Sequence, residues 1–185
     1  MIILNLGAGD NLIKGAINVD ITPKEGIDEV IDLTKIPWKW EDESISKIYL
    51  IHSLEHFPQP KEILQECHRI LKPGGIIEII VPHSSSAMAV GCLGHYRTYS
   101  YDTLNDYLSR PFYLFKEKMF ETQKQELRWW YGRKVVNVPF WMLCFIIPLN
   151  KLINLLAGIS PQVCENLWCY WVGGMKEVVW IGKKV

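Results

Sequence analysis

The two strands predicted at the N-terminus are joined by a short segment, and this spacing restricts the fold more than any other feature. Residues 2–6 form an apolar run that ends at Gly7, and residues 17–20 form a second short run. Only seven residues, 10–16, separate the glycine turn from the second run, whereas a helical crossover needs about ten to twelve. An extended segment of that length still spans roughly 23 Å, so the second strand can run parallel to the first. We therefore expect a parallel sheet in which a loop replaces the first helix.

Further strands alternate with short connections and one clear helix. Residues 29–32 and 47–51 are strand-sized segments. From Pro60 onward, apolar residues recur at helical spacing until residues 72–75, Lys-Pro-Gly-Gly, which end the helix. Residues 76–81 then form a nearly continuous apolar run, typical of a central parallel strand. This alternation predicts an α/β fold with a Rossmann-like, doubly wound sheet.

The pattern after His83 is less regular. A helix is predicted to open at residues 101–104, with Ser100 or Asp102 as its N-terminal cap. Residues 112–121 are predicted to form a strand, and residues 178–181 another. The C-terminal part is also rich in bulky aromatic residues, at 165–168 and 170–174, which suit either a core packed on the sheet or an aromatic substrate pocket.

Residues 140–157 form an apolar, helical segment with Pro148 in its middle. The apolar stretch of about 17 residues is at the lower limit for spanning a bilayer. It is compatible with an interfacial helix that brings the protein to a membrane-bound substrate. Because Pro148 interrupts it and its polar face is thin, a buried helix pair or a homodimer surface through residues 140–171 is an equal alternative.

Length, charge and cysteine content limit the class of protein. The 185 residues suit a single domain, with a cofactor-binding half at residues 1–83 and a substrate-side half at residues 84–185. Twenty basic and twenty acidic residues give no net charge, so we expect no nucleic-acid partner. The five cysteines are odd in number and read as reduced, mostly buried thiols. With no signal peptide recognised, we expect a cytoplasmic protein, peripheral to a membrane if the apolar segment binds lipid.

The residues after the first two strands suit a cofactor without phosphates. Gly7 and Gly9 allow a tight turn and a close approach of the backbone to a ligand. Leu12 stands where a dinucleotide site has its third glycine, and no helix follows to bind a pyrophosphate, which argues against NAD. Asp20 ends the second strand, where a carboxylate accepts hydrogen bonds from both ribose hydroxyls unless it only faces solvent.

Five segments occur in the order and spacing of a known family. They are Asp32-Leu33, Ile36-Pro37-Trp38, Asp42-Glu43-Ser44-Ile45, His52-Ser53-Leu54-Glu55-His56 and Leu71-Lys72-Pro73-Gly74-Gly75. Together they resemble the class I methyltransferases of the "methyltransferase domain 11" type. The resemblance implies S-adenosylmethionine as cofactor and S-adenosylhomocysteine as product, with Asp32 on the adenine amino group, Asp20 on the ribose and the glycines along the methionine part. The implied cofactor residues are Leu6, Gly7, Ala8, Gly9, Asp20, Ile21, Asp32, Leu33, His52, Ser53, Leu54 and His56.

A narrower resemblance explains the missing helix. Leu4-Asn5-Leu6-Gly7, followed after a short loop by Asn18-Val19-Asp20, looks like a compact branch of that family with L-N-L-G-x-G and N-V-D segments. The same branch has a D-P-T-H-x-R-x-F/Y-T segment, and residues 94–100, Gly-His-Tyr-Arg-Thr-Tyr-Ser, are similar apart from the Asp-Pro-Thr part.

Three residues are candidates for catalysis. His83 follows a strand at the edge where α/β sheets bind ligands, so its imidazole, or that of His95, can take a proton from the acceptor. Arg97 can hold an anionic group. Equally, the three can merely support the loop over the cofactor, because methyl transfer can rest on alignment alone. His52 and His56 are expected to close the pocket and pack, and no cluster with metal-ligand spacing is visible, so no metal is predicted.

The sequence thus predicts an S-adenosylmethionine-dependent methyltransferase that acts on an oxygen or nitrogen of a small-molecule, glycan or lipid-linked acceptor. The alternative is a non-catalytic protein that senses S-adenosylmethionine or serves as a subunit of a larger enzyme, which the short chain and the absent helix allow. A nicotinamide-dependent oxidoreductase is a third reading of the glycine turn.

Overall fold

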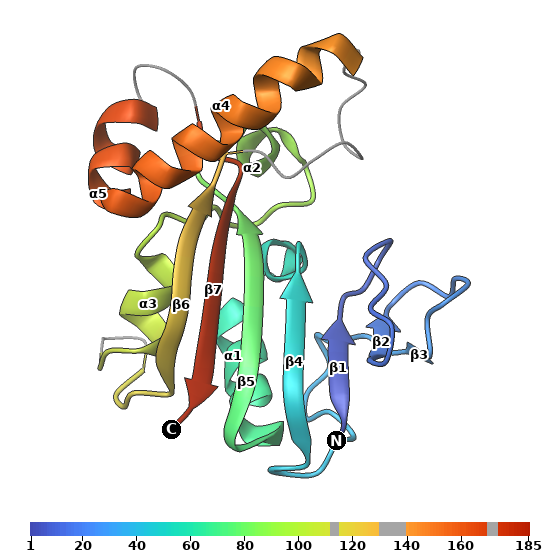
Figure 1. Cartoon of the computed structure of the whole chain (residues 1–185). Helices are drawn as coiled ribbons and strands as arrows, with labels where there is room; N and C mark the ends of the chain where they lie inside the picture. Colours follow the sequence, from blue (N-terminus) through green and yellow to red (C-terminus); the bar gives the residue numbers. More distant parts are fainter. Residues whose placement is uncertain (112–114, 130–139, 170–173) are drawn as a thin grey trace.

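A computed structural model describes residues 1–111, 115–129, 140–169 and 174–185 of the chain. Its described strands form one mixed, seven-stranded sheet in the order β3-β2-β1-β4-β5-β7-β6, which confirms the predicted Rossmann-like α/β fold (Figure 1). Strands β1 to β5 pair in parallel, and β7 is antiparallel to both of its neighbours. The strands are β1 (Ile3–Leu6), β2 (Ile17–Asp20), β3 (Glu29–Val30), β4 (Ile45–Ile51), β5 (Leu71–Pro82), β6 (Phe120–Arg128) and β7 (Glu177–Lys184).

The connection from β1 to β2 contains turns and no helix, as the spacing predicts. Two buried asparagines hold this loop. Asn5 Nδ2 donates to the carbonyl oxygen of Asn11, at 2.8 Å, and to Asn18 Oδ1, at 2.9 Å. Asn18 Oδ1 also accepts a hydrogen bond of 2.9 Å from the backbone N–H of Ile13. Side-chain amides therefore satisfy the backbone groups that a helix would otherwise pair internally.

The helix α1 (Pro60–Ile70) begins where the sequence predicts, and Leu71 already starts β5. Two of its charged residues fix the loop between β3 and β4. Glu66 Oε1 accepts a 2.7 Å hydrogen bond from the backbone N–H of Trp38, and Arg69 reaches the carbonyl oxygen of Trp38 at 3.2 Å and Asp42 Oδ1 at 2.6 Å. These charge-assisted contacts order a segment that has no helix of its own.

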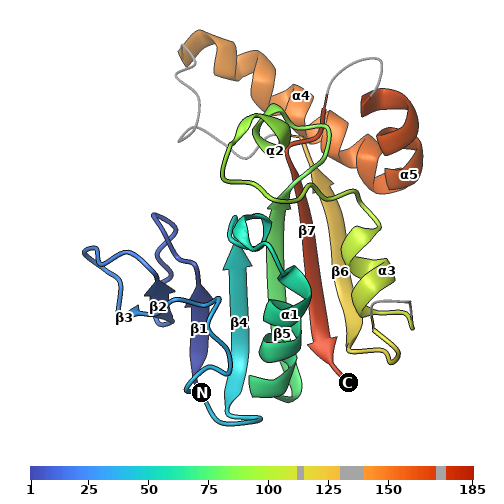
Figure 2. The ribbon, with the colours of Figure 1, turned by 180° about the vertical axis from the view of Figure 1, so that it is seen from behind.

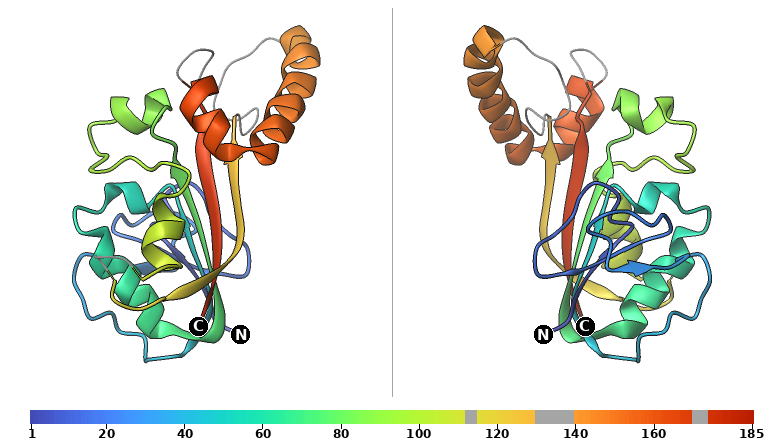
Figure 3. Two further views of the ribbon diagram at one scale, coloured as in Figure 1. Left: turned by 90° about the vertical axis from the view of Figure 1, so that its left-hand side faces the viewer. Right: turned by 90° about the vertical axis from the view of Figure 1, so that its right-hand side faces the viewer.

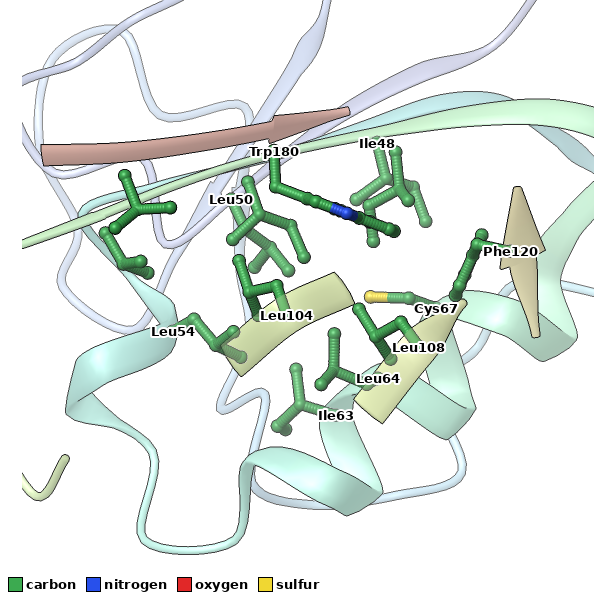
Figure 4. Packing of buried hydrophobic residues seen from close by; sticks show 14 of the residues in the cluster. Ile48, Leu50, Leu54, Ile63, Leu64, Cys67, Leu104, Leu108, Phe120 and Trp180 are labelled. Carbon is green, nitrogen blue, oxygen red and sulfur yellow. The ribbon is translucent and has the colours of Figure 1, made fainter. Parts of the chain in front are cut away.

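The core lies between the sheet and the helices α1 and α3 (Thr103–Leu108) (Figure 4). Trp180 of β7 is fully buried and meets the ring of Phe120 edge-on, with ring centroids 5.9 Å apart. Its indole Nε1 donates to Thr122 Oγ1 at 3.1 Å, so the polar atom of this large side chain is satisfied. A Cβ atom at Gly182 would overlap the six-membered ring of Trp180, which explains why glycine stands two positions later in the strand.

Helices α1 and α3 lie on the same face of the sheet (Figure 3). Over the described residues, the lower part of the opposite face has no helix on it and presents half-buried polar groups instead. Lys47 Nζ lies 3.0 Å from Glu78 Oε2 and 4.1 Å from the ring centroid of Tyr49. The ion pair and the aromatic contact allow this face to meet water without a covering helix.

The remaining helical elements stand beyond the carboxyl ends of the parallel strands (Figures 1 and 2). They are the 3₁₀ helix η1 (Leu54–His56), α2 (Ala87–Gly91), α4 (Phe140–Ile159), α5 (Pro161–Val163) and the π-helical turn η2 (Cys164–Trp168). Asn154 Oδ1 of α4 accepts a 2.8 Å hydrogen bond from the N–H of Trp129, which ties α4 to the end of β6. The expectation that Pro148 interrupts this segment is wrong, since α4 continues through it.

Among the described helices, none is by itself long and apolar enough to cross a membrane. Cys144–Ile159 and Pro161–Trp168, bent by 112° at the break between them, reach that length and apolarity only as a pair.

Two other predictions for the second half need correction. The strand predicted at residues 112–121 is wrong for residues 115–119, because β6 begins at Phe120 and extends to Arg128, while residues 112–114 lie outside the described ones. The sequence of β6 is mostly polar because one side of this edge strand faces solvent, so it lacks an apolar signal. The thiols are also not mostly buried, since Cys92 and Cys144 are exposed.

Candidate functional site

A cavity of about 390 Å³ lies at the carboxyl ends of the first strands and is of a size typical of small-molecule sites. Nine of the twelve predicted cofactor residues line it: Gly7, Gly9, Asp20, Ile21, Asp32, Leu33, His52, Ser53 and His56. Ile31, Thr34 and Phe57 line it as well, and the sequence reasoning missed them. Each of the three is within two positions of a predicted residue, so chain proximity was the available signal.

The floor of the cavity depends on glycine at position 7. Its backbone has φ +68°, a conformation that L-residues with a Cβ rarely adopt. A Cβ atom there would also overlap the side chain of Ser53, which precedes η1. Gly9 has φ +50° but open space where its Cβ would be. The turn after β1 can therefore approach the η1 segment only with glycine at position 7.

Asp20 is held in a fixed orientation at the end of β2. Its Oδ2 accepts a 2.8 Å hydrogen bond from the N–H of Gly9, and its Oδ1 accepts one of 2.9 Å from the N–H of Thr22. Each carboxylate oxygen can accept a second hydrogen bond. A half-exposed carboxylate with both oxygens positioned in this way suits a pair of neighbouring hydroxyl groups, as on a ribose.

Asp32 is positioned by Thr34, which also lines the cavity. Asp32 Oδ1 accepts hydrogen bonds from Thr34 Oγ1, at 2.6 Å, and from the N–H of Thr34, at 3.1 Å. These bonds hold the pKa of the Asp32 carboxyl below its usual value. The bond from the Thr34 side chain has the largest effect, and the nearby charge of Lys35 adds to it. The Asp32 carboxylate is thus ionised and can accept a hydrogen bond through its other oxygen.

His52 forms part of the cavity wall in a left-handed conformation, with φ +51°. Its Nε2 lies 2.9 Å from Glu177 Oε1, and its Nδ1 lies 3.5 Å from Glu55 Oε1. Burial lowers the pKa of His52, but the hydrogen bonds to Glu177 and then Glu55 outweigh it and raise the pKa to about 9. The side chain is therefore an imidazolium at neutral pH, compensated by two buried carboxylates.

The three other predicted cofactor residues do not line the cavity with their side chains. Leu6, Ala8 and Leu54 are at most 1% exposed and belong to the hydrophobic interior. The N–H of Ala8 donates to the carbonyl oxygen of Val19 at 2.9 Å. These residues shape the cavity from behind.

His83 is placed differently from the expectation for a general base. It is only 1% exposed, and both ring nitrogens have partners. Its Nε2 lies 2.9 Å from Glu165 Oε1, and its Nδ1 accepts a hydrogen bond of 3.1 Å from the N–H of Ser85. Glu165 Oε1 also accepts a 2.8 Å bond from the N–H of Tyr101. In this arrangement His83 joins the end of β5 to η2 and has no free nitrogen for a substrate proton.

His95 and Arg97 lie in different surroundings. The ring of His95 packs against that of His56, with centroids 4.7 Å apart. Arg97 lines a separate cavity of about 640 Å³ next to α1 and α3, which shares no lining residue with the first cavity. None of His83, His95 and Arg97 lines the cofactor cavity, and His95 contacts His56, which does.

A third cavity, of about 410 Å³, is almost entirely apolar and lies between α4, α5 and η2. Its lining residues are Ile153, Leu156, Ala157, Ser160, Val163, Cys164, Leu167 and Trp168. Two bulky segments were considered for a substrate pocket. In the first, residues 165–168, Leu167 and Trp168 line this cavity, whereas Glu165 is hydrogen-bonded to His83 and Tyr101. In the second, residues 170–173 lie outside the described ones.

Comparisons with known proteins agree with this geometry. Residues 17–79 match the model of a family described as "Methyltransferase domain". No curated protein matches the chain. Among solved structures, a SAM-dependent methyltransferase from Archaeoglobus fulgidus is 19% identical with a TM-score of 0.60, over 98% of this chain and 85% of the other. A putative sarcosine dimethylglycine methyltransferase from Galdieria sulphuraria is also 19% identical, with a TM-score of 0.56, over 98% and 76%.

A further solved structure with this fold contains a second protein. It is a complex between the Haloferax volcanii Trm112 methyltransferase activator and a putative methyltransferase, 14% identical to this chain with a TM-score of 0.58, over 98% of this chain and 81% of the other. At such low identities these likenesses establish the fold.

The residues around the cavity fit S-adenosylmethionine. Asp20 and Asp32 present oriented carboxylates that would accept hydrogen bonds from the ribose and the adenine amino group, and Ile21, Ile31 and Leu33 would supply apolar contacts for the base. Nothing lies within 4 Å of the Cβ position of Gly9, so the backbone there would be open to the methionine part. The match of residues 17–79 covers most of these side chains, including both carboxylates.

Proposed function

We propose that the chain is a class I S-adenosylmethionine-dependent methyltransferase and that it methylates an oxygen or nitrogen of a lipid-linked acceptor at a membrane surface. The cofactor supplies an electrophilic methyl group, which the acceptor atom takes by displacement. In this reading Asp20 and Asp32 hold the nucleoside, and the cavity wall fixes the direction of the methyl group. Alignment of this kind lowers the barrier without an obligatory base.

The observation that carries the proposal is the apolar surface of the hairpin formed by α4, α5 and η2. Its exposed apolar side chains include Phe145 (72% exposed), Leu155 (64%) and Ile159 (74%). Exposed apolar side chains concentrated on one part of a fold mark an interaction surface. The full set is Phe145, Ile147, Leu149, Leu152, Leu155, Leu156, Ile159, Val163 and Leu167.

The distribution of these side chains favours lipid over a second protein copy. At 100° per residue, Phe145, Leu149, Leu152 and Leu156 form one stripe of α4, Leu155 and Ile159 widen it, and Ile147 lies well to one side. Lys151 is the sole charged residue between positions 140 and 163. A flat protein partner covers one stripe, whereas a bilayer interface surrounds a helix along its whole exposed arc, so this pattern suits insertion into the interface.

The position of the hairpin fits an acceptor delivered from a membrane. The α4 and η2 elements stand beyond the same carboxyl edge of the sheet at which the cofactor cavity lies (Figure 1). The apolar cavity of about 410 Å³ inside the hairpin suits a hydrocarbon chain. We propose that an acyl or prenyl chain of the acceptor is held there. A peripheral location at the cytoplasmic membrane follows from this proposal.

Vesicle binding tests the membrane part. Wild-type protein is expected to float with phosphatidylcholine–phosphatidylglycerol vesicles, and the double variant Leu155→Glu/Ile159→Glu to stay in solution. Leu93→Glu is the matched control, because Leu93 is fully exposed but lies outside the hairpin. Absence of wild-type binding rejects the membrane surface. A concentration-dependent dimer in analytical ultracentrifugation, abolished by the double variant, assigns the patch to a second copy instead.

Label transfer tests the acceptor class. Membrane extracts incubated with the protein and methyl-labelled S-adenosylmethionine are expected to carry the label in the organic phase. Label found only in water-soluble small molecules or glycans contradicts the lipid-linked acceptor while leaving methyl transfer intact.

A further inference from the structure

Three side chains with metal-binding atoms meet at the edge of the cofactor cavity, although the sequence spacing predicts no such cluster. They are Glu55 and His56 of η1 and His95 of the loop before α3, and one ligand atom from each lies within 4.8 Å of the others. The backbone brings them together, because the N–H of Tyr96 donates to the carbonyl oxygen of Glu55 at 2.9 Å. The loop that carries His95 is thereby fixed against η1.

The buried carboxylate of this cluster has His52 as a charged neighbour but no hydrogen-bond partner among the described residues. Glu55 is 1% exposed, and neither carboxylate oxygen has a hydrogen-bond partner among the described residues. The imidazole Nδ1 of His52 is 3.5 Å from Oε1, and that ring is bonded more closely to Glu177. Removing a carboxylate from water costs several kcal/mol unless it is paired and hydrogen-bonded. Because the single charge of His52 is shared between Glu177 and Glu55, the Glu55 carboxylate can accept a further cation.

The two histidines are arranged as metal-ligating histidines usually are. His56 Nδ1 lies 2.9 Å from the carbonyl oxygen of Gly94, so it carries the proton, and Nε2 keeps its lone pair. His95 Nδ1 is buried without a hydrogen-bond partner in the described part of the chain. His56 is exposed and His95 half-exposed, so an ion can reach the cluster from solvent.

We propose that Glu55, His56 and His95 bind one divalent transition-metal ion of the zinc type. Two imidazoles and one carboxylate match the ligand set of zinc sites that keep a coordination position open, and imidazoles disfavour magnesium and calcium. Ligands about 2.1 Å from a tetrahedral ion lie about 3.4 Å apart. The three ligand atoms lie within 4.8 Å of one another without an ion, so they would have to move closer together when one binds.

The site would serve the acceptor side of the cavity. His56 is both a proposed ligand and part of the cofactor cavity wall. An ion at this place would have its open position next to the cavity, where it can hold a water molecule or an acceptor oxygen.

Cobalt titration followed by absorbance spectroscopy and calorimetry tests the site. Protein treated with a chelator and then titrated with Co²⁺ or Zn²⁺ alone is expected to bind one equivalent, with the visible bands of a four- or five-coordinate cobalt site. His95→Ala is expected to lower the affinity about 100-fold or more. Glu55→Gln should lower the affinity by a similar factor. If this buried variant does not fold, His95→Ala still tests the metal site, because His95 is half-exposed.

His68→Gln is the matched control, because His68 lies in α1 against Phe120 and outside the cluster. It should bind metal as the wild type does. The proposal is overturned if the wild type binds no equivalent of either ion, if His95→Ala keeps the wild-type affinity, or if His68→Gln loses as much. Metal binding is measured without turnover, so this result is independent of the methyl acceptor.

Discussion

His52 Nε2 lies 2.9 Å from Glu177 Oε1, although 125 positions separate the two residues. The contact joins the residue after β4 to the first residue of β7, with β5 between the two strands in the sheet. Together with Glu55, this contact keeps an imidazolium in the cofactor cavity wall, since the pKa of His52 is raised to about 9. Loss of the charge on His52 at alkaline pH is therefore expected to lower the stability of the fold.

Stability is expected to fall as the pH rises from 7 to 10. The pKa of His52 is about 9 in the folded protein and 6.5 in the unfolded chain. Its contribution is therefore complete below pH 6.5 and is lost as the pH passes 9. One pKa unit corresponds to about 1.4 kcal/mol, so the difference between about 9 and 6.5 corresponds to a loss of at most about 3.5 kcal/mol. Urea unfolding at pH 6, 8 and 10 measures it.

Glu177→Gln should weaken this pH dependence, because it removes the carboxylate bonded to Nε2. His68→Gln is the control, because burial lowers the pKa of His68 and places its titration below this range. Equal slopes in wild type and Glu177→Gln between pH 7 and 10 would refute the assignment to His52.

Asp20→Ala is expected to weaken binding of S-adenosylhomocysteine at least about 10-fold in isothermal titration calorimetry. The loss removes the acceptor for the ribose hydroxyls and frees the N–H groups of Gly9 and Thr22. Asp106→Asn, on the surface of α3, should bind normally. Normal affinity of Asp20→Ala means that the ribose is held elsewhere.

Gly7→Ala should cost about 2–5 kcal/mol in the free energy of unfolding and abolish cofactor binding. It combines a left-handed backbone, about 1–2 kcal/mol, with overlap on Ser53, about 1–3 kcal/mol. Adding Ser53→Gly removes the overlap and should restore part of the stability. Gly9→Ala, with open space around its Cβ, should cost only the backbone part. A Gly7→Ala variant no worse than Gly9→Ala would contradict the close approach at Ser53.

Two glycine substitutions in the C-terminal part should act in opposite directions. Gly182→Ala places a methyl group on the buried indole of Trp180 and should lower the unfolding free energy by about 1–3 kcal/mol. Gly158→Ala meets nothing within 4 Å and lies in α4, so it should raise stability by about 0.5–1 kcal/mol. Thermal unfolding of both variants checks the pair, and a stabilised Gly182→Ala would show that the packing at Trp180 is wrong.

The sequence predicted the first half of the fold well because its signals are local. The short spacing between β1 and β2, the helix from Pro60 and the apolar run of β5 are each visible within a few residues. The strand β6 was misplaced because its polar sequence carries no periodic signal at an open sheet edge. Pro148 was expected to break the helix, but α4 continues through it. The surrounding apolar residues favour the helical conformation.

For the site, residues at strand ends were predictable and long-range partners were not. Nine predicted residues line the cavity, because parallel strands end at the same edge. In contrast, the burial of His83 depends on Glu165, 82 positions away, and the cluster at Glu55 depends on His95. No spacing rule reveals contacts of that range, since the intervening loops set them.

The loop that replaces the first helix also bears on how the protein responds to its ligand. Residues 7–16 are held by Asn5, Asn18 and a few turns rather than by a ladder of backbone hydrogen bonds. Such a segment opens at low free energy, independently of the sheet that α1 and α3 cover. A bound cofactor would bridge this loop to β2 and β4, slowing amide exchange and proteolysis there first. Cofactor binding in the cavity and ordering of residues 7–16 are therefore expected to occur together.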